Sequence, residues 1–123
     1  MAEKKQMMNN HKFTYKNNFL NILDEKILIC DGAMGTMLQN MGCSTCPDHL
    51  NIANDDDKKK VLNVHLGYLE AGSDIIQTNT FGSNPSKLET CGLLSDIEKI
   101  NKNAVSIAKE AINTYKEKTG SNR

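Results

Sequence analysis

The chain has 123 residues, the length of one ordinary domain, with 15 basic and 15 acidic side chains and therefore no formal net charge. That balance gives no compositional support for binding to nucleic acid or to an anionic membrane. Apolar residues make up 38% of the chain, and the apolar runs are too short to predict a transmembrane helix. The polar N-terminus leads into no export signal, so we expect a cytoplasmic protein without nucleic-acid or membrane partners.

The chain divides into a tail and one regular pattern. The polar segment 1–16 is predicted to be disordered, and residues 17–123 are predicted to form the ordered part. A short helix is expected over 17–25. The continuous apolar run Ile27–Cys30 predicts a fully buried strand that ends at an Asp-Gly turn signal.

Two helices and a second strand follow. A short helix is expected over Gly35–Met41. Asn54 is a candidate N-cap for a longer helix that opens with three aspartates, which the helix dipole favours there, and Gly72 is the expected stop. The run Asp74–Thr78 then predicts a second buried strand.

Two further helices complete the pattern. A small helix is expected near Ser86–Thr90. Ser95 and Glu98 have the spacing of a capping box for a long helix over 96–115. One face of this helix carries an apolar stripe formed by Ile97, Ile100, Ala104, Ile107, Ala108, Ala111 and Tyr115.

The alternation of strands and helices predicts an α/β fold with a parallel sheet covered by helices. In such folds the loops that follow the carboxyl ends of the strands form the binding sites. Both strand-to-helix loops of this chain are long and polar. The sequence therefore predicts a small-ligand site at these two loops.

The four cysteines are expected to be reduced thiols, because no export signal precedes them. Cys30 lies in the first predicted strand, where it fits as a small buried side chain. Cys43 and Cys46 have C-x-x-C spacing, with His49 nearby, but no second pair completes a zinc set. A small metal-binding α/β protein that uses Cys43 and Cys46 is therefore kept as an alternative interpretation.

Several motifs in one order resemble the homocysteine S-methyltransferase family. The segment Ile27–Thr36, ILICDGAMGT, resembles the opening strand and loop of that family. Pro47–Asn51, PDHLN, and His65–Ser83, HLGYLEAGSDIIQTNTFGS, resemble its next two motifs. Within the family, the resemblance is strongest to the homocysteine-binding module at the N-terminus of cobalamin-dependent methionine synthases, over about Leu20–Lys116.

The resemblance implies a (β/α)₈ TIM barrel, of which this chain would form the first two βα units and thus an incomplete N-terminal part. It implies methyl transfer to the thiol of homocysteine in methionine biosynthesis, with zinc and cobalamin as cofactors. In the family zinc is held by cysteines on later strands, so the zinc ligands are not expected in this chain. The partners implied are homocysteine, the remaining barrel segment and the cobalamin and folate modules. A non-catalytic fragment or subunit is the alternative, and activity of the chain alone is left open.

The resemblance also implies a set of substrate-binding residues. Asp31 resembles the acidic group that receives the homocysteine ammonium, and charge-assisted hydrogen bonds suit that role; a simple turn is the alternative. Glycines in the first loop are expected to allow close approach or a positive φ, and Thr36 to cap a helix or donate a hydrogen bond. The predicted set is Asp31, Gly32, Gly35, Thr36, Thr78, Asn79, Thr80 and Phe81, with no catalytic or metal-binding member. For the last four, a polar loop that bonds to itself is the alternative.

Overall fold

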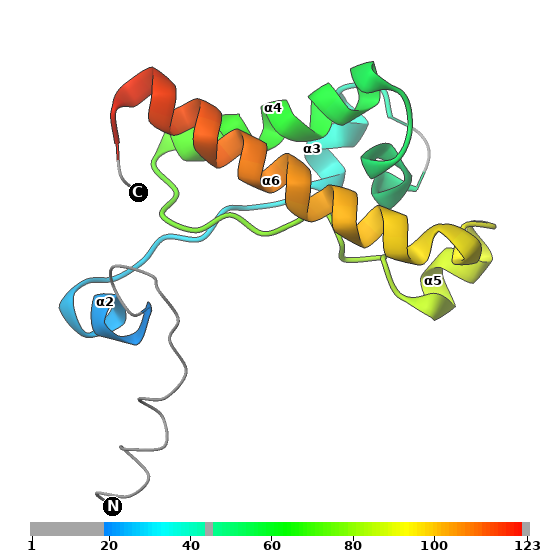
Figure 1. The fold of residues 1–123 in the computed structure, drawn as a ribbon, viewed down its shortest axis with the longest axis horizontal. Helices are drawn as coiled ribbons and strands as arrows, with labels where there is room; N and C mark the ends of the chain where they lie inside the picture. The colour runs from blue at the N-terminus through cyan, green and yellow to red at the C-terminus, as the bar shows by residue number, and fades with distance from the viewer. Residues whose placement is uncertain (1–18, 44–45, 122–123) are drawn as a thin grey trace, which may run out of the picture.

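The computed structural model describes residues 19–43 and 46–121, and the predicted tail over 1–16 lies outside these ranges. The described elements are helical (Figure 1). In chain order they are α2 (Phe19–Glu25), α3 (Gly35–Asn40), the 3₁₀ turn η1 (Pro47–Asn51), α4 (Asp55–Ala71), α5 (Pro85–Thr90), the 3₁₀ turn η2 (Leu94–Asp96) and α6 (Ile97–Thr119).

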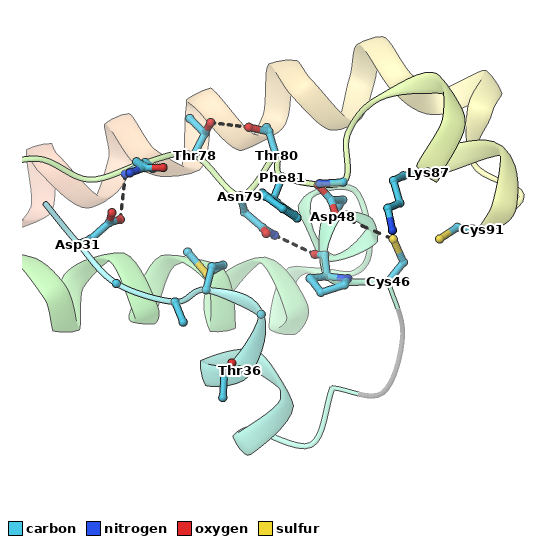
Figure 2. A pocket seen from close by; sticks show the side chains of 17 residues that line it. Asp31, Thr36, Cys46, Asp48, Thr78, Asn79, Thr80, Phe81, Lys87 and Cys91 are labelled. Atoms are coloured by element: carbon cyan, nitrogen blue, oxygen red, sulfur yellow. Dashed lines mark hydrogen bonds between the residues drawn. The ribbon is translucent and has the colours of Figure 1, made fainter.

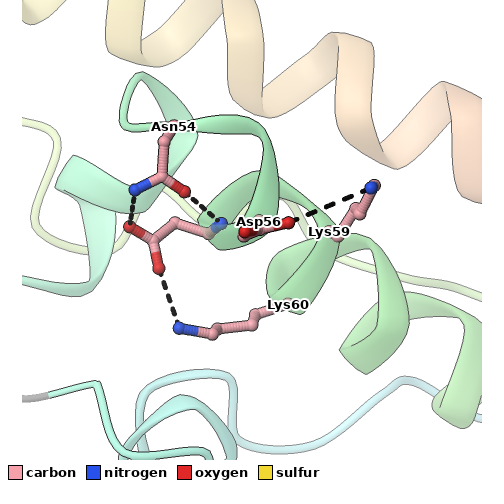
Figure 3. A network of polar contacts seen from close by, with 5 residues as sticks. Asn54, Asp56, Lys59 and Lys60 are labelled. Carbon is pink, nitrogen blue, oxygen red and sulfur yellow. Dashed lines mark hydrogen bonds and ion pairs between the residues drawn. The ribbon is translucent and has the colours of Figure 1, made fainter.

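Both ends of α4 form as the sequence predicts. The Asn54 Oδ1 atom accepts a hydrogen bond of 2.9 Å from the Asp57 N–H, and the Asp57 carboxylate accepts one of 2.9 Å from Lys60 Nζ (Figure 3). The hydrogen bond from Lys60 lowers the pKa of Asp57. At the other end, Gly72 has φ 108°, in the left-handed region that favours glycine. Local capping therefore fixes where this helix begins and ends.

The long helix α6 forms as predicted, but its predicted cap does not. The stripe is confirmed over its central part, because Ile100, Ala104, Ile107, Ala108 and Ala111 are all buried, whereas its two end members are half-buried. No side-chain hydrogen bond caps the N-terminus of α6. The prediction of a capping box formed by Ser95 and Glu98 is wrong. Residues 94–96 instead form the turn η2, which leads directly into the helix.

The core lies where α4 and α6 pack side by side and run in the same direction (Figure 1). Helix α3 packs against α4, and the turn η1 packs against both α4 and α6. The buried apolar cluster consists of Leu38, Cys43, Leu50, Val61, Val64 and Ile107. By contrast, α2 buries none of its residues and lies away from the α4–α6 pair (Figure 1). Of the helices that the structure describes, none has the length and apolar character needed to cross a membrane.

The predicted fold class, α/β with the first two βα units of a TIM barrel, is wrong. Within residues 19–43 and 46–121 there is no strand or sheet, and the backbone pairing between the two predicted strands stops at one parallel bridge, between Cys30 and Ile75. The first of them is not buried either: Ile27 is 91% exposed and Ile29 is 60% exposed.

Two aspartates explain why the pairing stops at one bridge. Asp31 N–H donates to the Ile75 carbonyl at 2.9 Å, and a parallel ladder would continue from Gln77 N–H to the Asp31 carbonyl. Instead the Asp31 carboxylate accepts the Gln77 N–H at 2.8 Å. On the other side, the Asp74 carboxylate accepts the Ile29 N–H at 3.0 Å. Side-chain acceptors thus replace the next bond at each end, as short polar residues do elsewhere.

Helix α4 buries a histidine that has no polar partner. His65 is 0% exposed, and neither ring nitrogen has a hydrogen-bond partner among the described residues. The sequence predicts packing of His65 at a helix–sheet interface; the side chain is buried, but no sheet lies beneath it. Burial lowers the pKa of His65, and the charge of Asp31 opposes this shift. The fold therefore favours the neutral ring.

The exposed apolar edge of the first extended segment is predicted to cause self-association. Uncapped apolar edges pair readily between molecules, and a charge within the edge prevents this. Ile27→Lys and Ile29→Lys should each lower the mass measured by size-exclusion chromatography with light scattering, whereas Val105→Lys, on the exposed face of α6, should not. A monomeric wild-type chain at high concentration would contradict this prediction.

Burial of neutral His65 is predicted to make stability depend on pH. Because the folded pKa lies below the ordinary value of 6.5, the unfolded chain binds the extra proton first as pH falls. The free energy of unfolding should therefore fall between pH 7.5 and 5.5, by up to about 1.4 kcal/mol per pH unit. His65→Leu should flatten this dependence in denaturant titrations, and His49→Gln should leave it intact. Equal slopes for His65→Leu and the wild type would refute the prediction.

Candidate functional site

The two polar loops meet in a cavity of about 720 Å³ (Figure 2). Its walls come from the loop before α3, the start of η1, the loop over 77–82 and the end of α5. The lining residues are Asp31, Gly32, Ala33, Met34, Gly35, Thr36, Cys46, Pro47, Asp48, Gln77, Thr78, Asn79, Thr80, Phe81, Gly82, Lys87 and Cys91. The structure thus brings all eight predicted site residues together in one pocket.

Asp31 lines the pocket and directly follows Cys30, one of the two bridge residues. Its backbone N–H is bound to Ile75, and its Oδ2 atom accepts the Gln77 N–H at 2.8 Å (Figure 2). Within the described ranges, no lysine or arginine forms an ion pair with this carboxylate. The Asp31 side chain therefore presents a fixed negative charge to the cavity.

Gly32 allows a close approach to Tyr68, and neither Gly32 nor Gly35 has a positive φ. A Cβ atom on Gly32 would lie 2.9 Å from the Tyr68 hydroxyl oxygen, which donates a hydrogen bond of 2.7 Å to the Ala33 carbonyl. Gly35 has only an ordinary contact with Pro47. The expectation of a positive φ at Gly32 or Gly35 is wrong, since the glycines with positive φ are Gly42, Gly72, Gly92 and Gly120.

Thr36 lines the pocket, but it does not cap α3. The N-cap position is Met34, and no side chain makes a capping hydrogen bond there. Thr36 lies inside the first turn of the helix, one residue after Gly35, so its hydroxyl is not placed to act as the cap. The capping role expected for Thr36 is therefore wrong.

The second loop is partly bonded to its neighbours. Asn79 Nδ2 donates to the Pro47 carbonyl at 2.8 Å and to Asn51 Oδ1 at 3.2 Å, and Asn51 Nδ2 donates to the Asn79 carbonyl at 2.7 Å. The Thr78 and Thr80 hydroxyls are 2.8 Å apart. The amide hydrogens of Asn79 thus hold η1 against this loop, which leaves them no role toward a ligand.

Phe81 lies at the rim of the pocket. Its side chain is 99% exposed, so it does not form the packed wall that a buried aromatic ring would give. The residue lines the cavity next to Thr80 and Gly82 in the chain, which line it too. Any contact between Phe81 and a ligand would therefore be made at the mouth of the cavity.

Asp48 is the main site residue that the sequence reasoning missed. This carboxylate is 4% exposed, and its Oδ1 atom accepts hydrogen bonds from Ser83 Oγ at 2.6 Å and from the Gly82 N–H at 3.2 Å. An acidic residue at the start of a short helical turn, directly after Pro47, was the available signal. Asp48 is a positioning residue, because it holds the 80–83 turn against η1.

The C-x-x-C cysteines belong to different environments. Cys43 is buried in the apolar core, whereas Cys46 lines the pocket. Across residues 19–43 and 46–121, no three His, Cys, Asp or Glu side chains are grouped to hold a metal ion. The described donors therefore do not fit the zinc site that the family resemblance implies, nor a metal site built on Cys43 and Cys46.

Gly82→Ala is predicted to loosen the second loop. The added Cβ would lie 2.6 Å from Asp48 Oδ2, inside a buried set of hydrogen bonds. Displacement of that carboxylate should lower the free energy of unfolding by about 1–3 kcal/mol. Gly67→Ala, which has open space around its Cβ, is the matched control and should not destabilise the chain. Urea titrations that show equal stability for both variants would contradict the role of Asp48.

The comparisons with known proteins agree with one another on a single family. Residues 28–122 match the family model described as homocysteine S-methyltransferase. The chain is 32% identical over 106 residues to a methionine synthase of Mycobacterium tuberculosis strain ATCC 25618 / H37Rv, with 80% of this chain and 9% of that protein covered. It is also 32% identical over 103 residues to a methionine synthase of Mycobacterium leprae strain TN, with 77% and 8% covered.

A solved structure shares the backbone arrangement. The metallated form of the homocysteine methyltransferase MmuM from Escherichia coli aligns with a TM-score of 0.68 and 24% identity. The alignment covers 81% of this chain and 36% of that one. This chain thus spans about a third of MmuM and less than a tenth of the two methionine synthases. Since the family model covers most of its length, the chain belongs to the homocysteine S-methyltransferase family.

Proposed function

We propose that the pocket binds homocysteine and that this chain contributes substrate recognition to methyl transfer onto the homocysteine thiol, in methionine formation. The observation that carries the proposal is the Asp31 carboxylate, which forms no ion pair among the described residues and lines a cavity inside the segment that matches the family. Homocysteine carries an ammonium group, a carboxylate and a thiol, and this cavity offers a partner for the first of these.

Asp31 is suited to bind the substrate ammonium. Its Oδ2 atom is oriented by the Gln77 N–H, so the carboxylate loses little conformational freedom when a cation binds. A charge-assisted hydrogen bond to an ammonium is stronger than a neutral one. Among the described residues, the other carboxylate oxygen accepts no hydrogen bond, so it is left for this contact.

The threonine pair offers a donor for the substrate carboxylate. Thr78 and Thr80 share one hydrogen bond between their hydroxyl groups. Two hydroxyl groups carry two hydrogens, and one bond uses only one of them. The second hydrogen can be donated to a ligand in the cavity, which both residues line.

Zinc, when bound by an enzyme of this family, supplies a Lewis acid that favours the thiolate form of the substrate thiol. The described residues of this chain hold no suitable ligand set, so no step through zinc or cobalamin is assigned to them. In the proposed role, this chain binds and orients the amino-acid end of homocysteine, and other protein segments supply the metal ligands and the methyl donor.

Asp31→Asn is the direct test, because it removes the charge and keeps an oxygen that can accept the Gln77 N–H. Calorimetric titration with homocysteine should show affinity weakened by about 1–3 kcal/mol, which is roughly 5- to 150-fold. 4-Mercaptobutanoate lacks only the ammonium group. It should bind the wild type more weakly than homocysteine does, and Asp31→Asn should bind the two ligands about equally.

Asp24→Asn is the matched control, since this carboxylate lies on exposed α2 and lines no part of the pocket. It should leave both affinities unchanged. Equal binding of homocysteine by the wild type and Asp31→Asn would remove Asp31 from the site. A wild-type chain that binds no homocysteine would contradict the proposed function itself.

A further inference from the structure

Two thiols face each other at one edge of the pocket (Figure 2). Cys46 lies directly before η1, and Cys91 is the C-cap residue of α5. Both line the cavity and both are free thiols. Segments that are far apart in the sequence thus bring two nucleophilic sulfur atoms together, and the proposed binding of homocysteine uses neither of them.

The environments of the two thiols differ. Burial, together with hydrogen bonding to Cys91 and the charge of Cys91, raises the pKa of the Cys46 thiol. Cys46 Sγ is also 4.0 Å from Asp48 Oδ2, to which it donates. Cys91 is exposed and Cys46 is half-buried. A reagent from solution therefore reaches Cys91 first, and Cys46 is the thiol placed behind it.

The other two cysteines share none of this geometry. Cys43 is packed among apolar side chains of the core. Cys30 is exposed, at the bridge with Ile75, and is not part of the cavity lining. They provide internal controls within the same chain.

We propose that Cys46 and Cys91 form a redox-modification site, at which a low-molecular-weight disulfide converts the two thiols into one disulfide across the pocket edge. The Cys91 thiolate attacks a sulfur of the disulfide, forms a mixed disulfide and releases one thiolate. Cys46, on losing its proton, attacks the Cys91 sulfur, forms the Cys46–Cys91 bond and releases the second thiolate. The two thiolates released take up the two protons, so the reagent is reduced by two electrons and the protein is oxidised by two.

Formation of the Cys46–Cys91 disulfide would change one wall of the pocket. The new bond would tie the segment before η1 to the end of α5, and it would remove the S–H donor of Asp48. A covalent link between distant segments stabilises the fold by restricting the unfolded chain. This inference stands whatever ligand the cavity takes, because it depends only on the thiol pair.

The test uses the reduced full chain and oxidised glutathione, followed by intact mass and thiol titration. The wild type should lose two hydrogen atoms and two titratable thiols. The double variant Cys30→Ser/Cys43→Ala, which keeps the proposed pair, should form the internal disulfide to the same extent. Cys46→Ser should instead gain one glutathione at Cys91. Closure should raise the thermal midpoint by at least about 4 °C, and dithiothreitol should reverse the increase.

Three outcomes would overturn the proposal. The first is a wild type that gains glutathione at Cys91 without forming an internal disulfide. The second is a disulfide that involves Cys30 or Cys43, shown by failure of the Cys30→Ser/Cys43→Ala variant to close while its circular dichroism matches the wild type. The third is closure in Cys46→Ser, which would show that Cys91 has another partner.

Discussion

Two carboxylates limit the pairing between the extended segments, and the geometry of the pocket depends on that limit. Asp74 accepts the Ile29 N–H on one side of the Cys30–Ile75 bridge, and Asp31 accepts the Gln77 N–H on the other. Each side chain takes a hydrogen bond that a parallel ladder would give to a backbone carbonyl. Asp31 is held in this way and lines the cavity, and its carboxylate forms no ion pair among the described residues.

A second set of buried polar contacts holds the turn η1 against the second loop of the pocket. Asn51 and Asn79 bond to each other, and Asp48 bonds to Gly82 and Ser83. Buried polar groups of this kind specify one arrangement, because each would lose its partner in any other. The turn η1 is in turn fixed against α4 and α6 by the core. The pocket is thus held by side-chain hydrogen bonds and helix packing, without a sheet in the described ranges.

Most local patterns formed as predicted, except for the caps expected at Ser95 and Thr36, and the other failures lie where a partner from a distant segment decided the outcome. The helices were predictable, because Asn54, Gly72 and the apolar stripe of α6 act within a few residues. The strands were not, because nothing local shows that Asp31 and Asp74 take backbone donors from the opposite segment. All eight predicted site residues line one cavity, since loops near a shared bridge must converge. Asp48 and the Cys46–Cys91 pair were missed because they depend on contacts between distant segments.

Scalar couplings across hydrogen bonds, measured by nuclear magnetic resonance on the isotope-labelled chain, test the central claim most directly. Such a coupling identifies the carbon of the acceptor group for a given N–H. We predict that the Gln77 nitrogen couples to the side-chain carboxyl carbon of Asp31, and the Ile29 nitrogen to that of Asp74. Coupling from Gln77 to the backbone carbonyl carbon of Asp31 would show that the ladder continues, and it would contradict the account.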